Sequence, residues 1–284
     1  MDRRVLITGT SSGIGLATAV HLAQAGWQVV ATMRDTSRRA SLDAAARAAG
    51  VGVDVRPLDV TSVAAIEDSI AGVERDCGPI DALVNNAGAG RVGSVEHLDD
   101  AAVRQVMDTN FFGVWNVTRA VLPRMRARGR GRVVTVTSIG GLIGQPFNDA
   151  YCAAKFAVEG MMEALAPVAR ELGIHVSVVE PGPVHTNFVQ ATRQASADVL
   201  AGRQDGYDAM AARYFERSRE TFATHGQTGA DVAAVIQQAL VDDPPHLRYL
   251  TSPYVTALAR RKYADVTGDG IVEVFAARLK APRS

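Results

Sequence analysis

The sequence predicts a single α/β domain, in which a doubly wound parallel β-sheet is covered by helices on both faces. Short runs of valine, isoleucine and leucine alternate with longer alanine-rich stretches along the first two thirds of the chain. Near-continuous apolar strands separated by helices are typical of a parallel sheet that is buried on both faces. Polar and glycine-containing motifs follow these strands directly, and such sheets bind ligands at the carboxyl ends of their strands. We therefore expect one site along one edge of the sheet, and one domain across residues 1–284.

The predicted elements alternate regularly through the first part of the chain, because β-branched apolar runs indicate strands and alanine-rich stretches indicate helices. Strands are expected at residues 4–8, 28–32, 53–58, 82–84, 132–137, 175–180 and 248–250. Helices are expected at residues 14–25, 41–49, 63–76, 100–110, 112–128, 150–172 and 231–240. The stretch 187–227 is polar and rich in alanine, arginine and glutamine, with a helical pattern at 209–224. We expect this stretch to be an insertion that forms a lid over the carboxyl edge of the sheet.

Composition excludes several classes of protein. Acidic and basic residues number 30 each, so the formal net charge is zero, which argues against nucleic-acid binding and against a polybasic membrane anchor. Cys77 and Cys152 are too few for a disulfide framework, and no histidines have metal-ligand spacing, so we expect no metal. The apolar run at the N-terminus is interrupted by Thr8 and Gly9, too early for a signal segment. We expect a cytoplasmic protein with no membrane insertion.

A glycine-rich turn joins the first strand to the first helix and indicates a dinucleotide site. Glycines there let the backbone approach a pyrophosphate, and the helix N-terminus supplies free N–H groups and a partial positive charge. The spacing is G-x-x-x-G-x-G, which differs from the common G-x-G-x-x-G fingerprint. A strand-to-helix turn without a ligand is the alternative. If a dinucleotide binds, we expect its contacts to include Gly9, Ser11, Ser12, Gly13, Ile14 and Gly15.

The end of the second strand bears on the choice between NADP(H) and NAD(H). Met33 stands where an acidic residue would accept a hydrogen bond from the NAD ribose. Arg34 can instead pair with a 2′-phosphate in a bidentate fashion, and Ser12 could add a hydroxyl contact. In the alternative, Arg34 is a solvated charge and Asp35 contacts the ribose. The sequence favours NADP(H).

Two further strand ends can contribute to the same site. After the third strand come Asp59 and Val60, where the carboxylate could accept from an adenine amino group. Asp59 or Thr61 could equally cap the following helix, before an acidic first turn. After the fourth strand come Asn86, Ala87 and Gly88, where small residues leave room for a ribose and asparagine amides can tie neighbouring loops together. An ordinary turn is the alternative there.

A serine, a tyrosine and a lysine suggest proton chemistry beside the dinucleotide. Ser138 follows the fifth strand, and Tyr151 and Lys155 share one face of the next helix at i and i+4. Reduction of a carbonyl by hydride requires a proton, and a cationic lysine lowers the pKa of a tyrosine from about 10 toward neutrality. Ser138 can orient the substrate oxygen, and Asn110 can bind the backbone and a water near Lys155. A tyrosine and a lysine at this spacing are common on helices, so only their place beside the other motifs makes them informative.

In order and spacing these motifs resemble those of the short-chain dehydrogenase/reductase family. The matching stretches are TGTSSGIG at residues 8–15, NNAG at 85–88, Asn110, Ser138, YCAAK at 151–155 and PGPVHT at 181–186. The resemblance implies a Rossmann fold of about seven parallel strands and a catalytic set of Asn110, Ser138, Tyr151 and Lys155. It also implies that the nicotinamide half contacts Pro181, Gly182, Val184 and Thr186, with Tyr151 and Lys155 beside it. Members are usually dimers or tetramers, so a homodimer or homotetramer is expected.

Within the family, the chain is most similar to the branch of 17-beta-hydroxysteroid dehydrogenase type 1 and photoreceptor-type retinol dehydrogenase. The supporting stretches are ATMRD at residues 31–35, GQPFNDAYCAAKFAVEG at 144–160, and SPYVTAL with KYADVTGDG near the C-terminus. This resemblance supports NADP(H) and a bulky apolar ketone or alcohol. The chain differs from that branch in two features: its lid stretch matches poorly, and it lacks the apolar C-terminal tail of the retinol-type members.

Two other functions remain open from the sequence. A reductase of a β-keto thioester or polyketide would need a basic docking patch for an acyl carrier, for which Arg193, Arg203 and Arg213 in the lid are candidates. A non-catalytic NADP(H)-binding sensor would be expected to lack Tyr151 or Lys155, and both residues are present.

Overall fold

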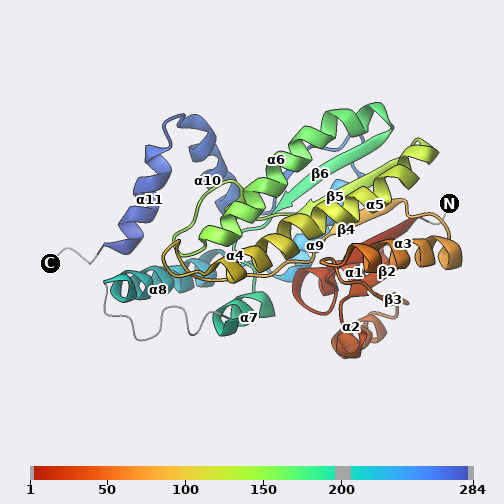
Figure 1. Cartoon of the computed structure of the whole chain (residues 1–284), viewed down its shortest axis with the longest axis horizontal. Helices are drawn as coiled ribbons and strands as arrows, with labels where there is room; N and C mark the ends of the chain where they lie inside the picture. The colour runs from red at the N-terminus through yellow and green to blue at the C-terminus, as the bar shows by residue number, and fades with distance from the viewer. Residues whose placement is uncertain (1–2, 196–205, 281–284) are drawn as a thin grey trace.

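A seven-stranded parallel sheet forms the centre of the molecule (Figure 1). This computed structural model describes residues 3–195 and 206–280. The strands are β1 (Arg4–Thr8), β2 (Gln28–Met33), β3 (Asp54–Pro57), β4 (Ala82–Asn85), β5 (Gly131–Val136), β6 (Ile174–Glu180) and β7 (Arg248–Leu250), in the order β3-β2-β1-β4-β5-β6-β7. Every neighbouring pair is parallel. The strand order departs from β1 in both directions, which is the doubly wound arrangement, so the predicted fold class is confirmed.

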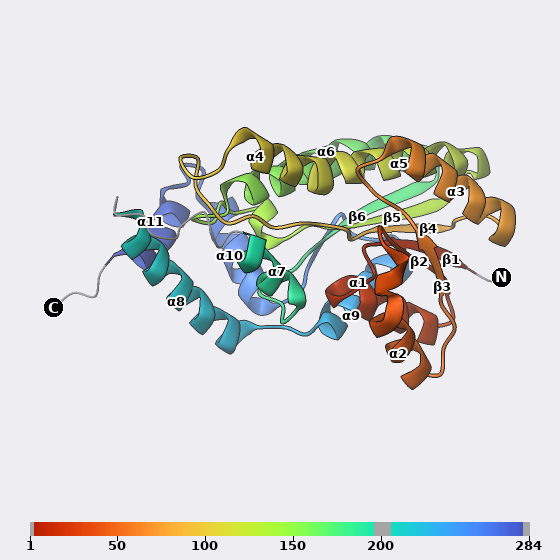
Figure 2. The same cartoon turned by 60° about the horizontal axis from the view of Figure 1, so that its bottom comes forward.

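Helices cover both faces of this sheet (Figure 2). Those following the strands are α1 (Gly13–Gln24), α2 (Ala40–Ala48), α3 (Val63–Cys77), α4 (Asp100–Met107), α5 (Gly113–Arg128), α6 (Asp149–Glu171) and α9 (Gly229–Val241). The others are α7 (Asn187–Ala195), α8 (Tyr207–His225), α10 (Pro253–Ala264) and α11 (Asp269–Leu279), with short turns η1 (Thr36–Arg39), η2 (Asp108–Phe112) and η3 (Ile139–Gly141). Within these described ranges, no helix combines the length and apolar character needed to cross a membrane.

Alternate residues of the strands point to opposite faces and build two cores. Leu6 and Leu83 are fully buried against α3, α5 and α6 on one face. Ile7 and Val84 are fully buried against α1, α2 and α9 on the other. The period of two residues in a strand produces this division, and each fully buried leucine or isoleucine stabilises the fold by roughly 1.5–3 kcal/mol. The apolar runs in the sequence are continuous because both faces are covered.

A third core lies beyond the carboxyl edge of the sheet. It joins η3 and the loop before α6 to α8, α10 and α11, and its buried members include Leu142, Phe147, Tyr214 and Phe275. Ser252 begins α10 by accepting a hydrogen bond from Val255 N at 3.4 Å, with Pro253 at the first helical position. Proline there loses no hydrogen bond, because the first helical N–H groups have no partner within the helix.

The structure corrects several local predictions. Ser62 caps α3, accepting from Ala65 N at 3.3 Å, so neither Asp59 nor Thr61 is the cap, and the first turn of α3 contains no acidic residue. The two helices expected at 100–110 and 112–128 form one continuous rod in which η2 is a π-helical turn. Helices α7, α10 and α11 were not predicted. Of the expected lid at 187–227, residues 196–205 lie outside the described residues.

Candidate active site

The turn between β1 and α1 is a tight cradle of backbone. Gly9 has φ +73°, and a Cβ atom there would lie 2.7 Å from Ala87 Cα. A Cβ atom on Gly15 would collide with the carbonyl oxygen of Gly9 and the amide of Asn86. Ser12, the residue before α1, makes no side-chain capping bond, so the first N–H groups of this helix are not used by that side chain. Only glycine fits this packing, which is the geometry that a close approach of a pyrophosphate requires.

The loop after β4 is tied to this cradle. Asn86 Nδ2 donates to the carbonyl oxygens of Thr8 and Gly9, both at 2.9 Å. Thr8 Oγ1 accepts from the backbone N–H groups of Asn86 and Ala87, both at 3.0 Å. Asn85 points the other way, donating to hydroxyls on α5 and β5. The expected use of asparagine amides to hold loops together is therefore present at both positions.

The ends of β2 and β3 lie side by side, since Leu58 N donates to Met33 O at 3.0 Å. Arg34 is exposed directly after β2. Asp35 accepts from Ser37 N at 3.0 Å and begins η1, so its carboxylate is already engaged. Asp59 likewise closes its own turn, accepting from Thr61 N at 3.0 Å and Thr61 Oγ1 at 2.8 Å. Both carboxylates thus use one oxygen in a local turn, whereas Arg34 extends from the end of β2 as an exposed cation.

Ser138 and Tyr151 meet beside η3. Ser138 Oγ accepts from Gly140 N at 3.0 Å, which orients the hydroxyl at the carboxyl end of β5. A Cβ atom on Gly140 would lie 3.3 Å from Tyr151 Cε1 and 3.4 Å from Ser138 Oγ, so glycine allows the two side chains to approach. A hydrogen bond with Ser138 lowers the pKa of Tyr151, although burial outweighs it.

Lys155 and Asn110, the other two members of the expected catalytic set, lie next to the loop after β4. Lys155 is 4% exposed, and its Nζ donates to Val136 O at 3.1 Å. Asn110 is fully buried; it accepts from Ala89 N at 2.9 Å and donates to Ala89 O at 2.7 Å. A Cβ atom on Gly88 would lie 2.9 Å from Asn110 Oδ1 and 3.9 Å from Lys155 Nζ. The expectation that Asn110 binds backbone is met, and the π-helical turn that carries it is a feature often found at functional sites.

Burial shifts the protonation of Tyr151 and Lys155 in opposite directions. It raises the pKa of Tyr151 to about 12. It lowers the pKa of Lys155 to about 8, against the opposing charge of Glu159. The lysine was expected to lower the pKa of the tyrosine, but the net shift is upward, because burial disfavours the phenolate and outweighs the hydrogen bond with Ser138. The Lys155 ammonium lies 5.8 Å from the centroid of the Tyr151 ring.

The loop after β6 closes the site from the side opposite β4. Pro181 O accepts from Ile139 N at 2.8 Å, which ties this loop to η3. Val184 pairs with Gln227 in an isolated bridge. A Cβ atom on Gly13 would lie 3.3 Å from Thr186 Cβ, so Thr186 reaches the glycine cradle. Gly182 packs against Val255 of α10. Of the four residues expected from this motif, Thr186 therefore adjoins the cradle, and the other three tie the loop to η3, Gln227 and α10.

Sequence reasoning missed Phe188, at the start of α7. Its ring lies 5.9 Å from the ring of Tyr151, and a Cβ atom on Gly90 would lie 3.0 Å from Phe188 Cζ. The first turn of α7 thus brings an aromatic ring beside the tyrosine. An apolar residue two positions after Thr186 was the available signal, but the polar composition of the following stretch obscured it.

A doubly wound sheet with a glycine cradle and a serine, a tyrosine and a lysine at its carboxyl edge is typical of dinucleotide-dependent oxidoreductases. The sequence model of the family described as short chain dehydrogenase matches residues 3–197. The chain belongs to this family of oxidoreductases.

Relatives extend over nearly the whole chain. Retinol dehydrogenase 8 of Bos taurus is 42% identical over 272 residues, covering 94% of this chain and 86% of the relative. The 17-beta-hydroxysteroid dehydrogenase type 1 of Homo sapiens is 39% identical over 279 residues, covering 94% of this chain and 83% of the relative. A solved variant of actinorhodin polyketide ketoreductase with NADPH has a TM-score of 0.72 at 32% identity, covering 90% of this chain and 92% of that one. Other solved relatives contain NAD or NADP. The resemblance to the retinol and hydroxysteroid dehydrogenases is confirmed.

Proposed function

We propose that this protein interconverts a bulky apolar ketone and its secondary alcohol with NADP(H), using Tyr151 as the proton donor and acceptor. The observation that carries the proposal is the position of Tyr151, whose side chain adjoins Ser138 and lies one helical turn from Lys155. The Tyr151 hydroxyl is protonated at neutral pH, so it has a proton to donate to a ketone oxygen as charge develops there, and the charge of Lys155 favours that transfer.

Each polar side chain has a distinct part in this proposal. Ser138, fixed by Gly140 N, hydrogen-bonds the carbonyl oxygen and orients it toward Tyr151. Tyr151 gives its proton to that oxygen in reduction and removes it in oxidation. Lys155 favours the phenolate that remains after proton donation. Asn110 fixes the loop at Ala89 and so keeps Gly88 clear for the ribose.

The glycine cradle fits a dinucleotide, because a Cβ atom at Gly9 or Gly15 would fill the space for close backbone approach. When bound, NADP(H) supplies or accepts the hydride. Residues that would hold the cofactor are Gly9, Ser11, Ser12, Gly13, Ile14, Gly15, Arg34, Asp59, Val60, Asn86, Ala87, Gly88, Tyr151, Lys155, Pro181, Gly182, Val184 and Thr186. Arg34 supports the phosphorylated form, because Asp35 is engaged at Ser37 N and Arg34 is exposed for a 2′-phosphate.

The substrate class rests on the relatives and on the surroundings of Tyr151. The aligned relatives are named for retinol and for a hydroxysteroid, which are both large apolar molecules. Phe188 lies against Tyr151, and aromatic residues of α8 pack on Phe147, in the loop just before the tyrosine. The aromatic ring of Phe188 beside Tyr151 favours an apolar substrate.

A polyketide or β-keto thioester is the second candidate, favoured by the similarity to a polyketide ketoreductase. Of the lid arginines weighed for an acyl-carrier patch, Arg213 is turned inward and donates to Leu279 O at 2.7 Å. Arg203 lies outside the described residues, and nothing is described of the side chain of Arg193. Arg213 is therefore not free to bind an acyl carrier. We rank the free apolar ketone first as the substrate class for this reason.

Oxidation of NADPH, with NADH in parallel, tests the proposal against 17-ketosteroids, retinal, small aromatic ketones and a β-keto thioester. We expect NADPH oxidation with a bulky ketone, and for Tyr151→Phe a fall of about a thousandfold, within the range for general acid–base catalysis. We expect Arg34→Ala to weaken NADPH binding and leave NADH binding unchanged. A clear NADH preference in the wild type would contradict the assignment of Arg34. Turnover of the thioester alone would move the second candidate to first place.

A further inference from the structure

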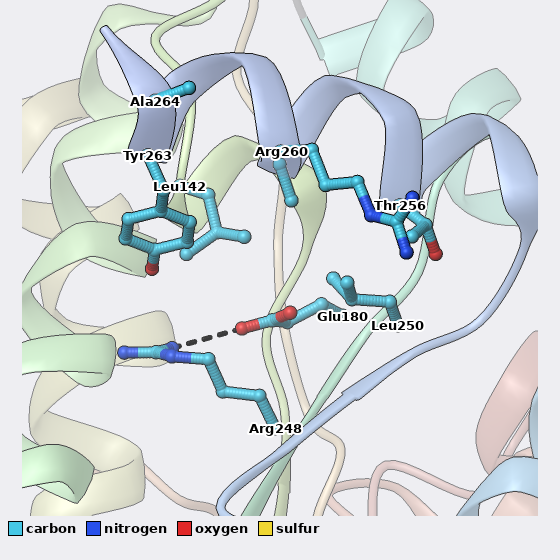
Figure 3. A pocket seen from close by; sticks show the side chains of 9 residues that line it. Leu142, Glu180, Arg248, Leu250, Thr256, Arg260, Tyr263 and Ala264 are labelled. Carbon is cyan, nitrogen blue, oxygen red and sulfur yellow. Dashed lines mark hydrogen bonds and ion pairs between the residues drawn. The ribbon is translucent and has the colours of Figure 1, made fainter.

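Three charged side chains form a group behind the candidate active site, and we call it the Glu159–Glu180–Arg248 cluster. Figure 3 shows two of them, Glu180 and Arg248. Arg248 Nη1 pairs with Glu159 Oε2 and lies 3.0 Å from Glu180 Oε1. Its Nη2 lies 2.5 Å from Glu163 Oε2, which is exposed at the surface of α6. One guanidinium therefore bridges α6 to the end of β6.

Burial makes this group costly unless its charges are paired and hydrogen-bonded. Glu180 is fully buried and Glu159 is 5% exposed. Among the described residues, Glu159 Oε1 and Glu180 Oε2 have no hydrogen-bond donor. Burial and the neighbouring Glu159 raise the pKa of Glu180 to about 7. Glu159 and Glu180 share the Arg248 guanidinium, and a proton on Glu180 removes the repulsion between the two carboxyl groups.

The cluster touches the segments that carry the candidate active site. Glu159 follows Lys155 at i+4, so the two side chains share one face of α6. A Cβ atom on Gly141 would lie 3.0 Å from Glu159 Cγ and 3.2 Å from Lys155 O, so η3 rests directly on this part of α6. Glu180 immediately precedes Pro181, whose carbonyl oxygen accepts from η3. A change in the position of Glu159 would therefore displace the neighbouring Lys155 and the loop after Ser138.

We propose that Glu159 is a positioning residue that keeps Lys155 charged in its buried site, and that Arg248 and Glu180 hold the Glu159 carboxyl in place for this purpose. The inference deepens the proposed function, since the charge on Lys155 is what favours the Tyr151 phenolate. Glu159 opposes the lowering of the lysine pKa by burial. Among the described residues, the charged and titratable groups that face the cluster are Lys155 and Glu163 on α6, and Arg260 and Tyr263 on α10.

A cavity of about 570 Å³ gives the cluster a route to solvent that avoids the candidate active site. It lies between the cluster and α10, and Figure 3 shows Glu180 and Arg248 on one side with Tyr263 and Arg260 on the other. Neither Ser138 nor Tyr151 lines it. Protons can therefore exchange with Glu180 without passing Ser138 or Tyr151.

The test measures the charge of Lys155 directly. The lysines of the chain are Lys155, Lys262 and Lys280, so labelling lysine with carbon-13 at the ε position gives a spectrum simple enough to titrate. We expect Glu159→Gln to lower the pKa of Lys155, and Glu159→Asp to restore most of it. Glu163→Gln is the matched control, because Glu163 binds the same Arg248 from an exposed position. Equal pKa values for Lys155 in wild type and Glu159→Gln would overturn the proposal.

Kinetics of the same proteins complete the test. We expect Glu159→Gln to lower kcat about tenfold with KM little changed, which corresponds to ~1.4 kcal/mol in activation free energy. Glu163→Gln should leave both constants unchanged. An equal loss in the two variants would mean that Arg248 is merely structural, and would overturn the proposal. If the wild-type protein reduces no carbonyl, the proposed function is wrong. The role of Glu159 can still be tested, because the lysine titration needs neither substrate nor cofactor.

Discussion

Tyr151 and Lys155 show how much a single residue's environment matters, because burial acts on both and moves their pKa values in opposite directions. The raised pKa of Tyr151, about 12, keeps the proton available for ketone reduction. The lowered pKa of Lys155, about 8, means that the ammonium is lost above that pH. We therefore expect ketone reduction to slow as the pH rises through about 8, and alcohol oxidation, which needs the phenolate, to be favoured at higher pH than reduction. Initial rates in both directions across this range check the prediction, and one shared optimum would contradict it.

The raised pKa of Glu180 predicts how the stability of the protein varies with pH, and this prediction can be tested without a substrate. Its pKa is raised from a usual 4.5 to about 7, so between these values the folded protein binds more protons than the unfolded chain. The contribution to stability is complete below pH 4.5 and is lost as the pH rises toward 7. Glu180→Gln cannot titrate. We expect the free energy of unfolding of the wild type, measured in urea, to fall relative to that of this variant between these two pH values. A constant difference would show that Glu180 titrates normally.

At the scale of elements, the strands were predictable because apolar runs of five or six residues leave few alternatives in a parallel sheet. The continuous rod of α4, η2 and α5 was not, because a π-helical turn depends on how Asn110 meets Ala89, a contact between distant segments. Helices α10 and α11 were missed although Ser252 and Pro253 are a recognisable start signal. Their apolar faces pack on α8 and η3 rather than on the sheet, so the strand-and-helix alternation gave no place for them.

The lid helix α8 is held by the last turn of α11. Arg213 Nε donates to Leu279 O at 2.7 Å, and Arg217 donates to Ala277 O and Lys280 O. Cations at a helix C-terminus satisfy free carbonyl groups and complement the helix dipole. We expect Arg213→Ala to raise KM for the ketone more than it lowers kcat, and to reduce stability by about 1 kcal/mol, the net value of such a hydrogen bond. Steady-state kinetics and urea unfolding measure both effects.

Arg219→Ala is the control for that prediction. Arg219 is exposed on the same helix, so its loss should change neither KM nor stability. If both variants raise KM equally, the surface charge of α8 is responsible and its attachment to α11 is not.

For the whole molecule, parallel strands explain why so much of the candidate site was predictable. Their carboxyl ends share one edge, so motifs far apart in sequence, such as Gly9, Asn86 and Ser138, must converge there. The Glu159–Glu180–Arg248 cluster could not be predicted in this way. Arg248 comes from β7, and its pairing with Glu159 depends on how that last strand joins the sheet beside β6. Charges of this kind become visible only when the packing of the whole chain is known.

Exposed apolar side chains on α5 and α6 bear on how copies of the chain assemble, and we propose that two copies associate through these helices. These helices lie on the same face of the sheet (Figure 2). On and beside them, large apolar side chains remain exposed: Phe112 by 48%, Trp115 by 45%, Phe156 by 39% and Val168 by 60%. Large exposed apolar side chains are a mark of interaction sites, and a two-fold axis would bring identical faces of two copies together.

We therefore expect the 30.1 kDa chain to sediment as a dimer or tetramer, and Trp115→Glu to shift it toward monomer. The charge would face its own copy across the axis, and burial of two like charges in an apolar contact is unfavourable. Val266→Glu is the control, since Val266 is 97% exposed and lies outside α5 and α6. Sedimentation velocity at micromolar concentration separates the outcomes. A wild-type monomer would exclude the proposed dimer, and an oligomer that Trp115→Glu leaves intact would place the interface on another face.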